Sequence, residues 1–198
     1  MLEFKDECVI GIDLAASSKN PTGWALLRGK ALETTLIRTD SEILKSIVKN
    51  QPILVAIDAP LHLPKKGNFF RSADRGMIRK GYKVFPPALP SMQKLTLRAI
   101  KLSRLIAEKK YKIIEVHPTS TRKALEMPLK DWKTIQEILK TLGLKGEFEK
   151  RALTSHEIDA AIAALTAVLH LKQQTERLGD HNEGYIIVPN KRNWRELV

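Results

Sequence analysis

The chain has 198 residues, of which 43% are hydrophobic and 28% charged, a composition typical of soluble globular proteins and not of disordered or membrane chains. Its length suits one domain with a substantial core, so we expect residues 1–198 to form a single domain. No apolar run approaches the roughly 18 residues of a membrane-spanning helix, and the N-terminus lacks the basic start and long apolar core of a secretory signal. The single cysteine excludes an internal disulfide. These features predict a cytoplasmic protein that does not associate with membranes.

Positive charge is concentrated in one segment of the chain. The formal net charge is +12, and between Pro60 and Lys110 thirteen Lys or Arg residues face only two acidic residues. Charge focused in this way suits a polyanionic partner, and we expect nucleic acid, either DNA or RNA. The alternative is a solvated basic face that only aids solubility. The candidate phosphate-binding residues are Lys65, Lys66, Arg71, Arg75, Arg79, Lys94, Arg98 and Lys101.

The first part of the chain predicts a meander of three strands, a helix and a further strand. Apolar runs predict the meander in CVIGIDL, WALLRG and ALETTLIR. Thr39 and Glu42 have the spacing of a capping box, which predicts the start of an amphipathic helix of about ten residues. The run ILVAID after Pro52 is fully apolar. Such a buried strand, reached through a helical crossover, favours parallel pairing with the first strand.

The segment that carries the positive charge predicts an irregular loop followed by a helix. Residues 60–90 contain eight Pro or Gly residues, which break any long element. An irregular stretch of this length inside a compact domain is usually functional. Ser91 is a candidate N-cap for a helix that runs to about Lys110. The loop and the helix together form a basic insertion at about 60–110.

The remaining third predicts one more buried strand, three helices and a final strand. The strand is KIIEV, and two helices follow at about 119–126 and 131–142. TSHE is a second capping-box match and opens a helix rich in alanine. Its small side chains let the helix lie close against a sheet, which would bring Asp159, one turn into it, near the strand ends. GYIIVP is a last apolar strand or an ordered return.

Five motifs, in their order and spacing, resemble those of a known family. They are GIDLA with a downstream GWAL, VAIDAPL, the R-x-x-D pattern that begins at Arg71, IEVHPTS and HEIDAAIAALTA. Over about residues 9–189 the chain resembles a domain-of-unknown-function family of predicted nucleases in the ribonuclease-H-like superfamily. The resemblance implies an α/β fold whose mixed five-stranded sheet combines an antiparallel meander with parallel strands and carries helices on both faces. It also implies that Asp13 on the central first strand is a metal ligand, that Asp58 and Asp159 occupy further acidic positions, and that Glu115 matches the family pattern.

Four carboxylates flanked by apolar residues form the candidate metal site. Asp13, Asp58 and Glu115 would lie at the carboxyl ends of parallel strands, the edge at which open α/β sheets bind ligands. Hard carboxylate oxygens without a Cys or His cluster favour Mg²⁺ or Mn²⁺ over Zn²⁺. Two such ions roughly 3.5–4 Å apart activate a water and stabilise the leaving oxygen of a phosphodiester. We therefore predict two-metal hydrolysis, with Asp13 as the bridging ligand, Asp58 and Asp159 as outer ligands, and Glu115 as a further ligand or a residue that orients water.

Three other polar residues are candidates for the site or for its support. His117 would shuttle a proton or orient a phosphate, or it is a hydrogen-bonded structural histidine. His156 stands at a helix N-terminus, where a cation is disfavoured, and is expected to be neutral and hydrogen-bonded. Asp74 is expected to pair with Arg71 or Arg75 rather than to bind metal.

Arginines and aromatic residues lie together in the basic loop. Arg71, Arg75 and Arg79 recur every four residues, so a short helix would align them on one face, where they would grip successive phosphates. The aromatic residues either stack on unpaired bases or form a small core that anchors the loop. They are Phe69, Phe70, Tyr82 and Phe85.

Two alternatives come from other functional classes. Actin-like and sugar-kinase domains also begin with a GID strand and a small-residue turn, here LAASS, which would cradle phosphate in a phosphotransferase or nucleotidase. Clear nucleotide affinity with Mg²⁺ would favour that interpretation. The other alternative is a protein that retains the fold and binds nucleic acid without cutting it. Tight, salt-sensitive binding without metal-dependent turnover would select it.

Overall fold

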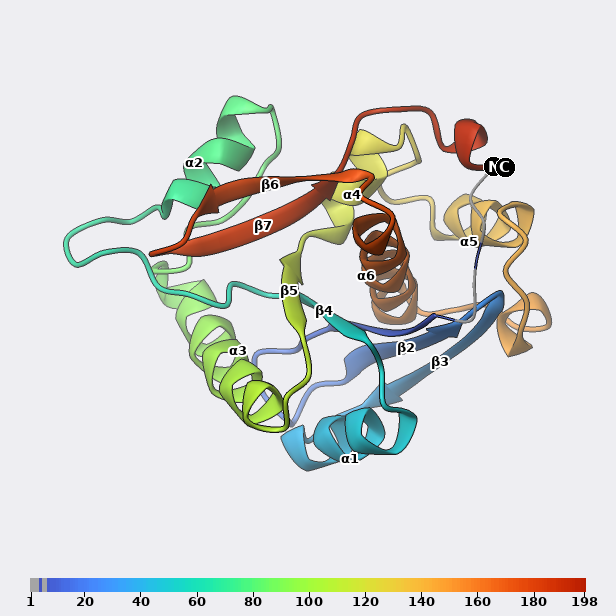
Figure 1. Ribbon diagram of the computed structural model, residues 1–198, viewed down its shortest axis with the longest axis horizontal. Helices are drawn as coiled ribbons and strands as arrows, with labels where there is room; N and C mark the ends of the chain where they lie inside the picture. The colour runs from blue at the N-terminus through green and yellow to red at the C-terminus, as the bar shows by residue number, and fades with distance from the viewer. Residues whose placement is uncertain (1–3, 5–6) are drawn as a thin grey trace.

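A seven-stranded mixed sheet runs through the protein in the order β3-β2-β1-β4-β5-β7-β6 (Figure 1). The computed structural model describes residue 4 and residues 7–198. The antiparallel meander β1-β2-β3 leads into the parallel neighbours β1, β4, β5 and β7, and β6 pairs antiparallel with β7 at the edge. The strands are β1 (Cys8–Asp13), β2 (Thr22–Arg28), β3 (Ala31–Ile37), β4 (Leu54–Asp58), β5 (Ile113–Val116), β6 (Thr175–Asp180) and β7 (Gly184–Pro189).

The sheet has seven strands and not the five that the family resemblance implies. The meander and the two parallel strands are confirmed, and GYIIVP is the strand β7. β6 was missed because its sequence, TERLGD, has neither an apolar run nor a clean alternation. It lies at the edge of the sheet, where its residues are half-buried or exposed, so burial leaves little pattern in the sequence.

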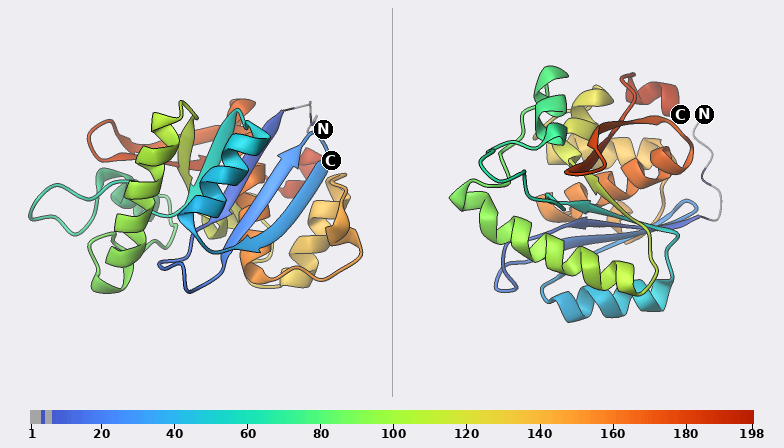
Figure 2. Two further views of the ribbon diagram at one scale, coloured as in Figure 1. Left: turned by 90° about the horizontal axis from the view of Figure 1, so that it is seen from below. Right: turned by 60° about the vertical axis from the view of Figure 1, so that its left-hand side comes forward.

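Helices cover both faces of the sheet, as expected (Figure 2). Two helices share a core with one face, a set of three lies on the other face, and α2 packs against the β6–β7 hairpin. The first two are α1 (Asp40–Asn50) and α3 (Pro90–Glu108), the other three are α4 (Pro118–Ala124), α5 (Trp132–Thr141) and α6 (Ser155–Leu171), and α2 is Ser72–Arg79. Short 3-10 turns at Glu147–Glu149 and Trp194–Leu197 complete the elements. Within the described ranges, no helix has the length and apolar character needed to cross a membrane.

Local sequence signals explain where these helices begin. The capping boxes predicted at Thr39 and Thr154 are both present, with the hydroxyl of each accepting from a backbone N–H three residues later. Asp131 caps α5 in the same way. The expected loop-plus-helix segment at about 60–110 contains α2 as well as α3.

The alternation of side chains along the strands separates two cores. In β1, Val9 belongs to the core under α5 and α6, whereas Ile10 and Ile12 belong to the core under α1 and α3. Since side chains alternate with a period of two, Asp13 points to the same face as Val9. The same holds in β4, where Ile57 faces α1 and α3 and Asp58 turns to the α6 face. Both carboxylates therefore lie under α6.

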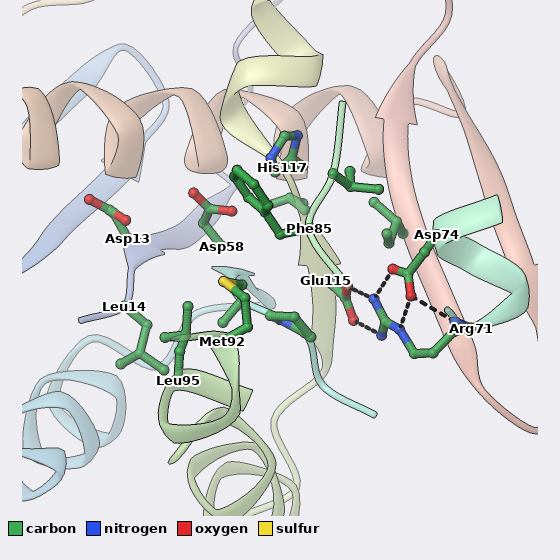
Figure 3. Close-up of a pocket in the computed structure, with 15 residues that line it drawn as sticks. Asp13, Leu14, Asp58, Arg71, Asp74, Phe85, Met92, Leu95, Glu115 and His117 are labelled. Carbon is green, nitrogen blue, oxygen red and sulfur yellow. Dashed lines mark hydrogen bonds and ion pairs between the residues drawn. The ribbon is translucent and has the colours of Figure 1, made fainter. Parts of the chain in front are cut away.

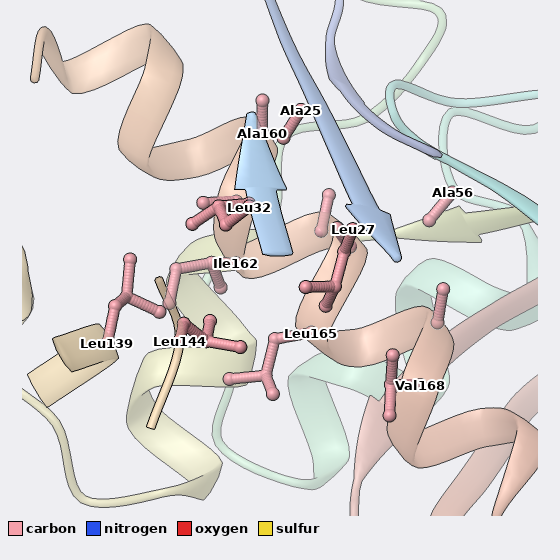
Figure 4. Packing of buried hydrophobic residues seen from close by; sticks show 14 of the residues in the cluster. Ala25, Leu27, Leu32, Ala56, Leu139, Leu144, Ala160, Ile162, Leu165 and Val168 are labelled. Atoms are coloured by element: carbon pink, nitrogen blue, oxygen red, sulfur yellow. The ribbon is translucent and has the colours of Figure 1, made fainter. Parts of the chain in front are cut away.

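Helix α6 lies unusually close to the sheet, as its alanine-rich sequence predicts (Figure 4). A Cβ atom added to Gly11 would stand 2.1 Å from the Ala160 carbonyl oxygen, and one added to Gly23 would stand 1.9 Å from that of His156. Real Cβ atoms do not approach backbone this closely, so only glycine fits at either position. This contact sets the height of α6 above the strand ends.

We expect Gly11→Ala to lower the free energy of unfolding by about 3 kcal/mol or more, because the helix backbone has to move away from β1. The measurement is urea unfolding followed by circular dichroism. The matched control is Gly67→Ala, where the added Cβ meets no atom within 4 Å and only the positive φ of 88° is unfavourable, at about 1 kcal/mol. Equal losses in the two variants would contradict the close-packing account.

Candidate functional site

Asp13 and Asp58 stand side by side at the carboxyl edge of the sheet. Each is the last residue of its strand, and the two are register partners across the parallel pair β1–β4. Figure 3 shows both carboxylates on the same side, above a cavity. The expectation that parallel strand ends bring these two acids together is confirmed.

The environment of this pair disfavours two negative charges. Burial raises the pKa of Asp13 to about 6, although a hydrogen bond from His156 acts in the opposite direction. Burial, together with the charges of Asp13 and Asp159, raises the pKa of Asp58 well above its usual range. A carboxylate pair held apart from water in this way gains from a bound cation, which would offset both the desolvation and the repulsion.

His156 joins this group from the first turn of α6. Its Nδ1 lies 2.6 Å from Oδ2 of Asp13, while half of the imidazole remains exposed to solvent. The hydrogen-bonded role expected for His156 is therefore confirmed, and its partner is a site carboxylate. The close approach of α6 to β2 at Gly23 brings the histidine to this position.

Asp159 lies one turn further along α6 and pairs with Arg122 of α4. The Arg122 side chain is only 2% exposed. Its guanidinium also donates to the Thr119 hydroxyl at 3.1 Å and lies over the Trp132 ring, 5.1 Å from the ring centroid. Arg122 is a member of the site that the sequence analysis missed. In a chain with 34 Lys and Arg residues, nothing in the sequence marked this one as buried.

His117 borders the same cavity from the end of β5. The strand stops at Val116, and His117 is the residue that precedes α4, with Nδ1 at 2.7 Å from the Ser120 hydroxyl oxygen. Burial, with a further contribution from the nearby Arg122 charge, lowers the pKa of His117 to about 4. The imidazole is therefore neutral at neutral pH. It is hydrogen-bonded within the protein and also reaches the cavity that Asp13 and Asp58 line.

Glu115 occupies the opposite face of the sheet from Asp13 and Asp58. It pairs in register with Ile57, whose side chain faces α1 and α3. Arg71 binds both of its carboxylate oxygens, at 2.8 and 2.6 Å, and the N–H of Leu61 donates to it at 2.8 Å. The ligand role predicted for Glu115 therefore finds no support in this geometry. Figure 3 shows its carboxylate directed to Arg71 and away from the aspartate pair.

The phosphate-binding role expected of Arg71 finds no support in its position. Arg71 is only 1% exposed, because it precedes α2 and turns its guanidinium inward to Glu115 and Asp74. Burial opposes its charge, but the two carboxylates outweigh that effect and raise the pKa of Arg71. The pairing expected for Asp74 is confirmed. The four-residue spacing misled because Arg71 lies outside the helix that carries Arg75 and Arg79.

Arg98, like Arg71, uses its guanidinium for bonds within the protein. It donates to Asp40 at 2.8 Å and to the carbonyl oxygens of Ala15 and Arg38 at 2.6 and 2.7 Å, so it ties α3 to α1 and to the turn after β1. The other six predicted residues are exposed to solvent. These are Lys65, Lys66, Arg75, Arg79, Lys94 and Lys101.

A cavity of about 200 Å³ opens beside the aspartate pair. Leu14, Met92 and Leu95 give it an apolar side, and Phe85 covers it from the basic loop (Figure 3). The ring of Phe85 is itself 72% exposed. Among the other loop aromatics, Phe69 is exposed, whereas Tyr82 is buried with Met77 in a small core. The small core expected for these residues is thus present around Tyr82, and stacking of the exposed rings on bases stays a prediction.

Comparison with known proteins places the chain in a family and identifies its fold. The family described as Protein of unknown function (DUF429) matches residues 11–184. The chain belongs to this family. A comparison with curated proteins gives no match.

Two solved structures resemble the protein in fold. One is T. thermophilus RuvC in complex with Holliday junction substrate, with 17% identity, a TM-score of 0.53, and coverage of 84% of this chain and 96% of that chain. The other is Thermus thermophilus RuvC, with 19% identity, a TM-score of 0.48 and the same coverage. The likeness to the first, with the strand order found here, confirms the ribonuclease-H-like fold.

The carboxylates fit a hard divalent cation only in part. Asp13 and Asp58 supply adjacent oxygens, while Asp159 is engaged by Arg122 and Glu115 by Arg71. Over the part of the chain that the structure describes, no three His, Cys, Asp or Glu side chains are grouped to hold an ion. Asp13 and Asp58 are therefore the residues whose donor chemistry fits Mg²⁺ or Mn²⁺.

We expect Glu115→Gln to lower the free energy of unfolding by about 3 kcal/mol, since it leaves the buried Arg71 charge with Asp74 alone. Mn²⁺ affinity, measured by calorimetry, should not change, because Glu115 faces away from the aspartate pair. The control is Glu176→Gln, which breaks the partly exposed pair with Lys80 and should cost at most about 1 kcal/mol in urea unfolding. A loss of Mn²⁺ binding in Glu115→Gln would restore it as a ligand.

Proposed function

We propose that the protein is a metal-dependent nuclease that hydrolyses phosphodiester bonds of DNA or RNA. The observation that carries the proposal is the Asp13–Asp58 pair: two register partners at the carboxyl edge of the sheet, with raised pKa values and, among the residues described, no Lys or Arg bonded to either. Asp13 and Asp58 would hold Mg²⁺ or Mn²⁺. When bound, the ion supplies an activated water and stabilises the charge of the leaving oxygen.

The protein's own residues would position the substrate and the ligands. His156 holds the Asp13 carboxylate through Oδ2, which orients the other oxygen. The neutral His117 at the cavity offers Nε2 as a hydrogen-bond partner for a phosphate or for water, because Nδ1 is taken by Ser120. Protons compete with the cation for Asp13, so metal binding should weaken as the pH falls through about 6.

The exposed lysines of the basic loop and of α3 support nucleic acid as the substrate. Lys65 and Lys66 lie on a loop whose position is fixed by Glu183, which accepts from the N–H groups of Lys65 and Ser72 at 2.6 and 2.8 Å. Lys94 extends from the turn of α3 that also lines the cavity through Met92 and Leu95. The likeness in fold to a RuvC bound to a Holliday junction is compatible with this assignment. Exposed cations of this kind bind phosphates without reading sequence.

A second candidate function is nucleic-acid binding without cleavage. It is favoured by the fact that two of the three acids near the strand ends are already bonded within the protein, Asp13 to His156 and Asp159 to Arg122. The phosphotransferase alternative has less support. In the LAASS turn, the N–H of Ala15 donates to Thr22 and its carbonyl accepts from Arg98, so this turn is tied into the fold.

We expect Asp13→Asn to abolish Mn²⁺-dependent cleavage, with a loss of at least about a hundredfold, because mutation of residues that only support a metal ligand already costs 10- to 100-fold. The measurement uses labelled single- and double-stranded DNA and RNA with and without Mn²⁺. Circular dichroism reports whether the fold is intact.

The control for this experiment is Glu137→Gln, an exposed α5 residue away from the cavity, purified in parallel to exclude a contaminating nuclease. Equal turnover by Asp13→Asn and wild type would contradict the nuclease proposal. Salt-sensitive binding by the wild type with no cleavage under any metal condition would select the binding function instead.

We expect Phe85→Ala to weaken binding of single-stranded oligonucleotides by roughly 1–3 kcal/mol, the contribution of one base stacked on an aromatic ring. The matched control is Phe69→Ala, since Phe69 is also exposed but does not line the cavity. Fluorescence anisotropy at fixed salt gives both affinities. Equal losses of affinity in the two variants would show that the Phe85 ring has no particular part in binding.

A further inference from the structure

Arg122 places a fixed positive charge among the carboxylates of the site. We infer that Arg122 takes the position of a second metal ion, so that the site binds one divalent cation between Asp13 and Asp58 while Asp159 remains paired with the guanidinium. The inference rests on the proposed function, because it concerns the ion that this function requires. It differs from the two-ion site that the sequence predicts.

The first step of the argument is that Arg122 is held in place and does not swing to solvent. Its side chain is 2% exposed, and Asp159, the Thr119 hydroxyl and the Trp132 ring contact it on different sides. Its Nε is buried and has no hydrogen-bond partner within the described chain. The contacts with Asp159, Thr119 and Trp132 thus hold this guanidinium in the interior although its hydrogen bonds are incomplete.

The second step is a balance of charge. Asp13, Asp58 and Asp159 contribute three negative charges when ionised, and Arg122 neutralises one of them. The two that remain match one divalent cation. A second ion would need the Asp159 oxygen that Arg122 already binds, and it would lie close to a guanidinium that the protein interior does not release.

The third step concerns the place of the guanidinium relative to the other carboxylates. Arg122 binds Asp159, which lies one turn of α6 beyond His156, and His156 contacts Asp13 at 2.6 Å. A second cation at Asp159 would therefore lie against the Arg122 charge.

The test counts bound Mn²⁺ at neutral pH from the electron paramagnetic resonance signal of the free ion, with calorimetry for affinity. We expect one ion in the wild type. Arg122→Gln frees Asp159 and should raise the number to two, whereas Arg122→Lys keeps the charge and should leave it at one. The matched control is Arg151→Gln, which removes the arginine paired with Glu157 in the first turn of the same helix and should not change the number.

The double variant Arg122→Gln/Asp159→Asn keeps the experiment decisive if Arg122→Gln alone does not fold. It removes one charge of each sign, so it should bind one ion with an affinity within about threefold of the wild type. Two ions in the wild type, one ion in a folded Arg122→Gln, or a tenfold weaker first ion in the double variant would overturn the inference. Absence of any Mn²⁺ binding by the folded wild type would instead overturn the proposed function itself.

Discussion

The contact of α6 with the meander is the constraint on which the site depends. Gly11 and Gly23 let the helix backbone touch β1 and β2, and this fixes the distance between the first turns of α6 and the strand ends. His156 and Asp159 stand on those turns, so their positions relative to Asp13 follow from backbone packing and not from flexible side chains. A site built on rigid elements in this way keeps its geometry without a bound ligand.

The buried carboxylates on the two faces of the sheet have different partners. On the α3 face, Glu115 and Asp74 enclose Arg71, and the group anchors the start of α2 to β5. On the α6 face, Asp13 and Asp58 lie together, and in the part of the chain that the structure describes no arginine or lysine bonds to either, although His156 contacts Asp13. A buried charge that is paired serves the fold, and one left uncompensated has to gain its stabilisation from outside the chain. Carboxylates at the ends of neighbouring strands thus differ in role: Glu115 stabilises the fold, whereas Asp13 and Asp58 are the candidates to bind a cation.

Much of this arrangement could be predicted from the sequence, and the errors have physical causes. Apolar runs that end in an acid identified Asp13 and Asp58, because a buried strand needs a run of apolar residues and the end of that run shows where the strand ends. Glu115 lies on the opposite face because its register partner is Ile57 and not Asp58, and the sequence of a single strand does not determine its register with a neighbouring strand. Arg122 could not be found in this way. Arg122 is buried because α4, α5 and α6 pack together around it, and the residues next to Arg122 in the sequence do not indicate such contacts.

A buried arginine also explains how the site exists before any metal binds. Three ionised carboxylates crowded at a partly desolvated edge would repel one another, and that repulsion would oppose the close packing of α6 on the sheet. Arg122 removes one of these charges permanently, because a guanidinium does not lose its proton in a protein. What remains to be neutralised is the pair at Asp13 and Asp58, which protonation can relieve at low pH and a divalent cation at neutral pH. The same residue that stabilises the fold without metal thereby limits how much positive charge the site can accept.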